Sequence, residues 1–185
     1  MKGPEQQLVF PLKAIPEDGL EIKVDLPREW LTNIPEYSDD RGTHIEGLIR
    51  AGGKLTREGD NFRLQGEVSA DLVTSCCRCG EDMHYPLAGK FEIVLIHGRE
   101  EVSGEERELL AEELSESYFE GEELDLNPYF QEEIALQSPL QPLCRRDCSG
   151  LCPMCGQNLN NGKCGCRQDE GDSRLAALKN LKIDH

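Results

Sequence analysis

The sequence predicts a mostly β (α+β) protein, in which antiparallel strands form a sheet or a partly open barrel and helices are few. Two long runs in the middle of the chain alternate apolar and polar residues with the period of a β-strand. The chain has no internal repeat and no alternation of strands with helical patterns, which disfavours a parallel sheet. Near its C-terminal end, four cysteines fall within the polar stretch LCPMCGQNLNNGKCGC, which predicts a small separate module.

The two long strands are expected at residues 61–73, NFRLQGEVSADLV, and at residues 85–97, YPLAGKFEIVLIH. In the first run Phe62, Leu64, Val68 and Leu72 share one face. Only about a dozen residues separate the runs, a length that favours a hairpin. We therefore predict an antiparallel pair with SCCRCGEDM at its tip.

Three shorter strands are expected at QLVFPLKAI, LEIKVDLP and THIEGLIRAGG. The last segment ends in the glycine pair Gly52 and Gly53. Because glycine pairs are typical of turns, the chain is expected to reverse direction there.

One helix is expected in LNPYFQEEIALQSP, with Asn127 as the N-cap and Pro128 in the first turn. Leu126, Phe130 and Ile134 would then share one face. The helix is expected to end near Ser138, because the proline that follows disfavours helical backbone angles at that residue.

Two further segments have helical signals. SGEERELLAEELSE carries a capping-box pattern at Ser103 and Glu106, but its apolar positions are sparse and it could equally be mobile. DSRLAALKNLKI offers Asp172 as an N-cap and is expected to form a short docking helix. The predicted organisation is thus a β-rich domain at 1–139 with an acidic insert at about 100–125, a cysteine-rich module at 140–168, and a short C-terminal helix at 169–185.

The formal net charge is −16, and residues 100–133 account for most of it with 14 acidic residues and a single base, Arg107. Such a run is typical of a solvated face or a flexible insert, and the alternative is a surface for a basic partner. Because phosphate binding needs clustered Lys and Arg, this charge argues against affinity for bare nucleic acid.

The expected location is the cytoplasm. No apolar run approaches the roughly 18 residues of a membrane span, and the N-terminus MKGPEQQLVFPLKAIP lacks the basic start and apolar core of a signal peptide. Thiols stay reduced in the cytoplasm, so the nine cysteines predict metal ligands before disulfides.

The string CPMCG places Cys152 and Cys155 at the spacing of a zinc knuckle, with Gly156 relieving the backbone after the second thiol. Cys164 and Cys166 follow eight residues later, after an Asn-Gly turn signal. Four thiolates would supply the folding free energy that this polar stretch lacks in apolar side chains. We therefore predict a structural zinc site at these four cysteines, in a C-terminal zinc-knuckle module.

Other cysteines offer additional or alternative ligands. Cys144 and Cys148 lie just upstream, and CCRCG supplies Cys76 and Cys79 at knuckle spacing. Cys76 and Cys79 could complete a shared site with part of the C-terminal group, or eight of the nine cysteines could form two separate all-thiolate sites. Iron in a rubredoxin-like site is the rival metal. A thiol-redox role for CxxC is also open, although that motif belongs to a βαβ setting.

The sequence predicts no enzyme and no small-molecule substrate. Its four histidines show no motif spacing, and the chain contains no P-loop, no GxSxG and no HExxH. A catalytic zinc usually has histidine or carboxylate ligands and an open position, whereas an all-cysteine set is typical of structural sites.

The C-terminal string PLCRRDCSGLCPMCGQNLNNGKCGC followed by DSRLAALKNL resembles the cysteine-rich form of the YceD family, the bacterial large ribosomal RNA subunit accumulation proteins. CCRCG, an acidic stretch and ELDLNPYFQEEIALQSPLQPLC agree with the family in order. The resemblance runs from about residue 44 to the end and is sharpest from 122 to 181. It implies a role in accumulation or processing of 23S rRNA, with a large-subunit precursor, 23S rRNA or a basic ribosomal protein as partner.

Some members of the family lack the GLCPxCG cluster, which argues against a zinc site that is itself the active centre. The resemblance carries no catalytic residues to this chain. Two other functions stay open from the cysteines alone, a zinc- or redox-responsive thiol regulatory protein and an iron electron-transfer protein.

Overall fold

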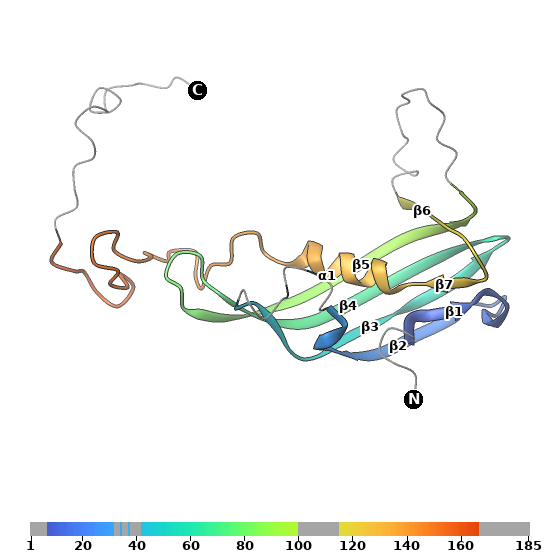
Figure 1. Cartoon of the computed structure of the whole chain (residues 1–185), viewed down its shortest axis with the longest axis horizontal. Coiled ribbons are helices and arrows are strands. Elements are labelled where there is room, and N and C mark those ends of the chain that lie inside the picture. Colours follow the sequence, from blue (N-terminus) through green and yellow to red (C-terminus); the bar gives the residue numbers. More distant parts are fainter. Residues whose placement is uncertain (1–6, 32–33, 35–36, 38–41, 100–114, 167–185) are drawn as a thin grey trace, which may run out of the picture.

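The structure is a computed structural model that describes residues 7–31, 34, 37, 42–99 and 115–166. Its main feature is a five-stranded sheet in the order β2-β3-β4-β5-β6, and β1 and β7 form a separate two-stranded sheet (Figure 1). The strands are β1 Val9–Pro11, β2 Leu20–Pro27, β3 His44–Glu58, β4 Asn61–Ser75, β5 Asp82–His97, β6 Glu116–Phe119 and β7 Glu123–Asp125. The described helices are the 3-10 turns η2 Leu12–Ala14 and η3 Arg28–Leu31 and the α-helix α1 Asn127–Gln137.

The predicted hairpin is confirmed as β4 and β5, which pair antiparallel from Phe62 opposite Leu95 to Ser75 opposite Asp82. The strand predicted at LEIKVDLP is β2, and it pairs antiparallel with β3. The sheet is not purely antiparallel, because at one edge β6 pairs parallel to the end of β5. The sheets do not close, so the mostly β class is confirmed as an open sheet and not as a barrel.

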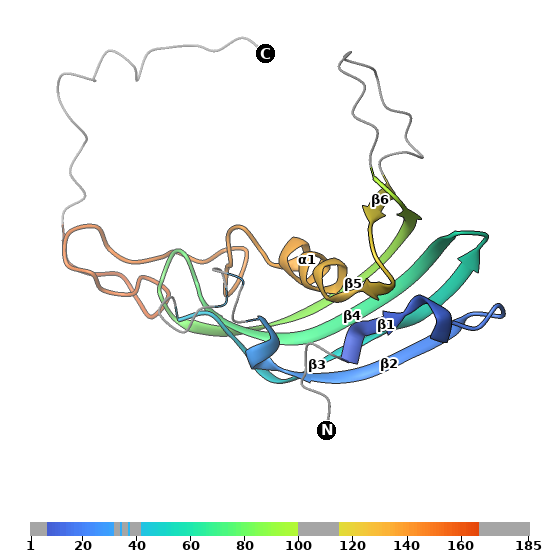
Figure 2. The same ribbon diagram turned by 45° about the vertical axis from the view of Figure 1, so that its right-hand side comes forward.

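The sheet curves, and α1 lies on its concave side (Figure 2). The face of β4 that the sequence predicts to be apolar is buried throughout, with Leu64 and Leu72 at 0 % and 2 % exposure. The helix contributes Phe130 and Ile134 to this core, and the Phe130 ring meets the Phe91 ring edge to face at 5.2 Å between centroids. Burying this shared apolar surface is what holds the helix against the sheet.

The expected turn at Gly52 and Gly53 is wrong, because β3 continues through both residues and the chain reverses after Glu58. A Cβ at Gly53 would collide with the backbone carbonyl oxygen of Gln65 and lie 2.9 Å from Gly66 Cα. The glycine therefore permits close approach of two strands, a second common reason for glycine inside a strand.

The predicted cap at Asn127 is wrong, because α1 begins one residue earlier than that cap would require: Asn127 is its first residue and Leu126 occupies the N-cap position. The Asn127 side-chain Oδ1 instead accepts a hydrogen bond from Trp30 Nε1 at 2.6 Å, and Asp125 Oδ1 accepts from the Asn127 backbone N–H at 2.9 Å. The predicted end near Ser138 is confirmed, with Ser138 at the C-cap.

Two expected helices lie mostly or entirely outside the described residues, which omit 100–114 and 167–185. They are the segment with Ser103 and Glu106 and the segment that starts at Asp172. Within the described part of the chain, no helix combines the length and apolar character needed to span a bilayer.

Candidate metal centres

Eight cysteines form two groups of four. The segments that carry them, the tip of the β4–β5 hairpin and residues 144–166, lie at one end of the molecule (Figure 1). Within each group the sulfur atoms all lie within 4.8 Å of one another. The first cluster is Cys76, Cys79, Cys144 and Cys148, and the second cluster is Cys152, Cys155, Cys164 and Cys166. The ninth cysteine, Cys77, is exposed and belongs to neither.

The first cluster joins two segments that are distant in sequence. Cys76 and Cys79 lie in the turn at the tip of the β4–β5 hairpin, and Cys144 and Cys148 lie in the chain that leaves α1. The Sγ atoms of Cys76 and Cys148 are 3.8 Å apart, and those of Cys79 and Cys144 are 3.7 Å apart. Three of the four side chains are at most 5 % exposed, so the cluster has little contact with water.

A tight turn positions the first CxxC pair. The Gly80 N–H donates to the Cys76 carbonyl at 2.9 Å, and the Cys76 N–H donates to the Glu81 carbonyl at 2.8 Å. Gly80 has a φ of +72°, which glycine adopts without the strain that a Cβ would bring. The Cys77 N–H donates to the Pro142 carbonyl at 2.9 Å and so holds the second segment against the turn.

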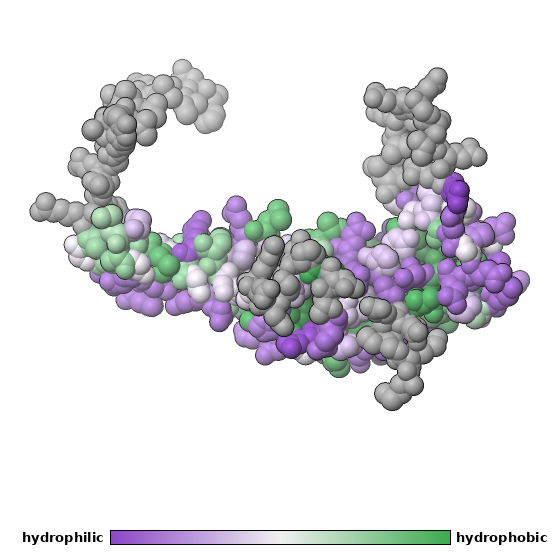
Figure 3. All heavy atoms as spheres, in the orientation of Figure 1, coloured by the Kyte–Doolittle hydropathy of each residue, from purple (hydrophilic) through white to green (hydrophobic). Residues whose placement is uncertain are grey.

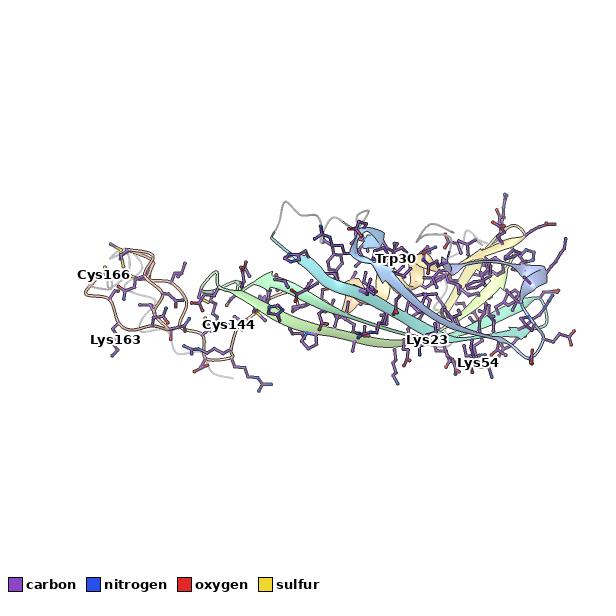
Figure 4. All side chains as sticks on the ribbon, turned by 90° about the horizontal axis from the view of Figure 1, so that it is seen from below. Lys23, Trp30, Lys54, Cys144, Lys163 and Cys166 are labelled. Atoms are coloured by element: carbon purple, nitrogen blue, oxygen red, sulfur yellow. The ribbon has the colours of Figure 1, made fainter. Side chains whose placement is uncertain are left out.

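The second cluster begins with the same turn. The Gly156 N–H donates to the Cys152 carbonyl at 2.8 Å, the Cys152 N–H donates to the Gln157 carbonyl at 2.8 Å, and Gly156 has a φ of +72°. Cys164 and Cys166 return to this turn from the far side of the loop. Figure 4 shows Cys144 at the junction with the sheet and Cys166 at the far end of the cysteine-rich loops.

The turns also polarise the sulfurs. Hydrogen bonding from the backbone of Cys144, and then of Arg78 and Cys79, lowers the pKa of the Cys76 thiol to about 6. Hydrogen bonding from the backbone of Cys155, followed by that of Met154, likewise lowers the pKa of the Cys152 thiol to about 6. In each cluster one thiol is thus prepared to be an anion near neutral pH.

A second thiol of each cluster shows the opposite effect. Burial, and then the neighbouring thiol of Cys148, raises the pKa of Cys144 to about 12. The hydrogen bond with Cys155 raises the pKa of Cys166 to about 12. Sulfurs packed this closely cannot all become anions unless a cation compensates their mutual repulsion.

Each group of four sulfurs could hold one metal ion, and two sulfur–sulfur distances of the first cluster can be compared with those of a tetrahedral site. A thiolate–zinc distance of about 2.3 Å gives a tetrahedron with edges of about 3.8 Å, and the two sulfur pairs of the first cluster measure 3.7 and 3.8 Å. Four thiolates leave no open position, so such a site is closed to substrate. A metal ion bound in this way would stabilise the fold of loops that have few apolar side chains of their own.

The structure brings together the four cysteines of the predicted main site and groups the four additional candidates separately. Cys76 and Cys79 lie with Cys144 and Cys148, so a site shared with the C-terminal four is not what the fold assembles. The spacing of Cys144 and Cys148 gave only a loose signal in the sequence. No sequence pattern pointed to Asn160, whose side-chain amide donates to Cys148 Sγ at 3.3 Å.

A shallow hollow of about 530 Å³ lies on the face of the sheet away from α1, with small residues at its floor. Lys23, Asp25, Arg50 and Lys90 are among the residues that line it, and Figure 4 labels Lys23 and Lys54 on this face. Lys90 pairs with Glu67 at 3.6 Å. The hollow is a surface of mixed charge and contains none of the clustered cysteines.

The sequence is similar to a known protein family and to several known proteins. A family model described as "Large ribosomal RNA subunit accumulation protein YceD" matches residues 64–182, a span that contains both clusters. The chain is 24 % identical over 171 residues to "Large ribosomal RNA subunit accumulation protein YCED homolog 1, chloroplastic" of Arabidopsis thaliana, covering 81 % of this chain and 51 % of that protein.

Two bacterial relatives extend the comparison. An uncharacterized protein of Mycobacterium tuberculosis is 31 % identical over 117 residues, or 62 % of this chain and 53 % of that one. The uncharacterized protein YlbN of Bacillus subtilis is 22 % identical over 175 residues, covering 94 % of both chains. The chain therefore spans about half the length of the chloroplast and mycobacterial relatives. No solved structure matches it.

Proposed function

The chain belongs to the YceD family of large ribosomal RNA subunit accumulation proteins, and from this we propose that it promotes the accumulation or processing of 23S rRNA during large-subunit assembly in the cytoplasm. The family match over residues 64–182 carries the proposal. The protein would act by binding and not by catalysis. An all-thiolate, closed coordination set supports that role, because such sites stabilise structure and leave no position for a substrate.

Zinc is the metal proposed for both clusters, in a structural role. Thiolate ligands in a tetrahedral arrangement are the set that zinc prefers, and iron is the rival. A zinc ion in the first cluster would fasten the tip of the β4–β5 hairpin to the segment after α1. A second ion would fold the 152–166 loop, in which Cys152 is the one side chain buried to 5 %.

The proposed partner belongs to the large-subunit precursor, and a basic ribosomal protein fits the charge best. A protein of net charge −16 repels phosphate, so direct contact with 23S rRNA would be confined to local basic residues. Apolar side chains are also exposed: Leu136 and Leu140 at the end of α1 are 71 % and 100 % accessible. Figure 3 shows hydrophobic residues at the surface on this side of the molecule.

The test is the ratio of 23S to 16S rRNA in cells of the source organism that lack this gene. A fall in the ratio, restored by the wild-type gene, is expected. Complementation by a Cys152→Ser, Cys155→Ser variant, with its abundance checked and Cys77→Ser as the matched control, would show whether the second cluster is needed. An unchanged ratio in the deletion strain contradicts the proposed function.

One observation favours a second candidate, a zinc- or redox-responsive thiol protein. In the second cluster Cys155 and Cys166 are exposed, so an oxidant can reach their sulfurs. Metal release by mild peroxide that reverses on reduction, with a phenotype limited to oxidative stress, would support this role. A metal that stays bound under the same treatment contradicts it.

A further inference from the structure

Asn160 lies in the loop between two cysteines of the second cluster, yet its side chain reaches the first cluster. Its Nδ2 donates to Cys148 Sγ at 3.3 Å. Its Oδ1 accepts from the Ser149 backbone N–H at 2.8 Å and from Arg145 Nη2 at 2.7 Å. Because both Oδ1 partners are donors, the orientation of the amide is fixed and its N–H group must face the sulfur.

The loop that carries Asn160 is held against the first cluster along its length. Leu151 and Asn158 form an antiparallel bridge, and the Leu159 N–H donates to the Gly150 carbonyl at 2.8 Å. The Leu151 N–H in turn donates to the Arg78 carbonyl, inside the first CxxC turn, at 3.1 Å. These bonds join the backbone of one cluster to the backbone of the other.

A side-chain contact and a close approach strengthen the same junction. Asn158 Nδ2 donates to Glu81 Oε1 at 2.9 Å, just after the first CxxC turn. Gly150 has a φ of +71°, and a Cβ there would lie 3.1 Å from the Arg78 carbonyl oxygen. The two loops therefore pack at backbone distance.

We propose that the two clusters bind metal cooperatively and that Asn160 is the positioning residue that links them. This inference rests on the proposed metal sites. An ion in the second cluster fixes both ends of the loop that carries Asn160. The fixed loop seats the amide on Cys148, where a hydrogen bond to a thiolate stabilises the anionic ligand of the first ion. By linkage, an ion in the first cluster strengthens binding at the second by the same factor.

Cobalt(II) is the probe, because in a tetrahedral thiolate site it reports its own binding through visible absorption. Titrations of the reduced, metal-free chain would compare three proteins. They are the wild type, a Cys152→Ser, Cys155→Ser variant that keeps the first cluster, and a Cys76→Ser, Cys79→Ser variant that keeps the second. Cooperative sites predict that the wild type binds each ion about tenfold or more tightly than the corresponding single-cluster variant does.

Substitutions at Asn160 identify the link. Asn160→Ala is expected to lower the affinity of the first cluster about 10- to 100-fold in the full chain. The same change should have little effect where the second cluster has been removed. Asn161→Ala is the matched control, because Asn161 is exposed and, within the described part of the chain, its hydrogen bonding is limited to the backbone N–H, which donates to the Asn158 carbonyl at 3.2 Å.

Asn160→Asp separates the sulfur contact from the packing of the loop. An aspartate keeps the acceptor for Ser149 and Arg145 but lacks the donor to Cys148, so it should lose the cooperativity as fully as Asn160→Ala. Wild-type cooperativity in Asn160→Asp overturns the assignment to this hydrogen bond. Far-UV circular dichroism checks that each variant keeps the β-sheet.

Different results would overturn the cooperativity and the metal sites themselves. Two bound ions whose affinities equal those of the single-cluster variants overturn the cooperativity and leave the metal sites intact. A wild-type chain that takes up no cobalt and no zinc overturns the metal sites, and the cooperativity with them.

Discussion

The indole Nε1 of Trp30 donates a hydrogen bond to Oδ1 of Asn127 at 2.6 Å, across 97 residues of sequence. Both residues are buried, at 1 % and 7 % exposure. The bond joins η3, which follows β2, to the first residue of α1. Gln131 Nε2 adds a bond to the Trp30 carbonyl at 2.9 Å. The start of the helix is therefore fixed by polar contacts, while its middle is held by apolar packing.

Replacing Asn127 by alanine is expected to lower the free energy of unfolding by about 1–3 kcal/mol, because the buried Trp30 N–H loses its acceptor. The chain has one tryptophan, so its fluorescence reports directly on this site during urea unfolding. Asn161→Ala, at an exposed position, provides the comparison. Equal midpoints for the two variants would contradict a stabilising role for the bond.

Several parts of this architecture were predictable because their signals are local. Strand alternation placed Leu64 on the buried face, helical spacing placed Phe130 and Ile134 in the core, and CPMCG indicated a knuckle. In each case neighbouring residues carry the whole pattern, and the pattern follows from backbone geometry.

The parts that sequence did not predict depend on which distant segment comes close. Asparagine is a common N-cap residue, but the Asn127 side chain instead accepts a hydrogen bond from Trp30, 97 residues away in the sequence. Gly53 belongs to a glycine pair that is typical of turns, but glycine is required there because the backbone of Gln65 on the next strand comes close. The division of the cysteines into two groups of four was one of the alternatives that the sequence left open, and what decides it is the exit of the chain after α1, which returns Cys144 to the tip of the β4–β5 hairpin.

The glycine pair in β3 gives a matched test of that approach. A Cβ at Gly53 collides with the backbone of β4, whereas one at Gly52 comes no closer than 3.4 Å to the Ile22 carbonyl oxygen. Gly53→Ala is therefore expected to destabilise the protein by about 1–3 kcal/mol or more, and Gly52→Ala by no more than about 0.5 kcal/mol. Thermal unfolding of the two variants checks this order, and the reverse order would refute the close approach.

We expect the stability of the protein to depend on pH through Arg63, because this residue bridges two carboxylates on the outer face of the sheet. Its Nε lies 2.6 Å from Glu58 Oε1, and its Nη1 lies 2.7 Å from Glu92 Oε1. The bond from Arg63 lowers the pKa of Glu58, and bonds from Gln65 and then Arg63 lower the pKa of Glu92. A carboxyl with a lowered folded-state pKa stabilises the fold above its ordinary pKa, and this contribution is lost as the pH falls.

Arg63→Gln should therefore raise the pKa of both glutamates towards the ordinary value of about 4.3. The stability difference from wild type should be largest at neutral pH and shrink below about pH 4. Because the groups are exposed, the difference should be small and should decrease with added salt. Carboxyl carbon NMR titration measures the two pKa values directly, with Lys54→Gln as a control on the same face. Unchanged values in Arg63→Gln would rule out the bridge.

Removal of one ligand of the first cluster should expose the chain after α1 to proteolysis. Arg145 and Arg146 are exposed trypsin sites between Cys144 and Cys148, so we expect their resistance to cleavage to depend on the conformation that a metal ion in the first cluster imposes. In zinc-loaded protein, Cys148→Ser is expected to raise the rate of cleavage at these arginines by about tenfold or more, because metal binding supplies much of the folding free energy of such loops. Peptide mass spectrometry identifies the cleaved bonds.

The matched control is Cys77→Ser, at the one cysteine that belongs to neither cluster. It removes a thiol from the same turn without changing the four sulfurs, so it should be cleaved as slowly as the wild type. Chelation of zinc from the wild type should reproduce the rapid cleavage of Cys148→Ser. If Cys148→Ser and Cys77→Ser are cleaved equally slowly and chelation has no effect, the sulfurs of the first cluster do not hold this segment, and the hydrogen bond from Cys77 to Pro142 is the stronger restraint.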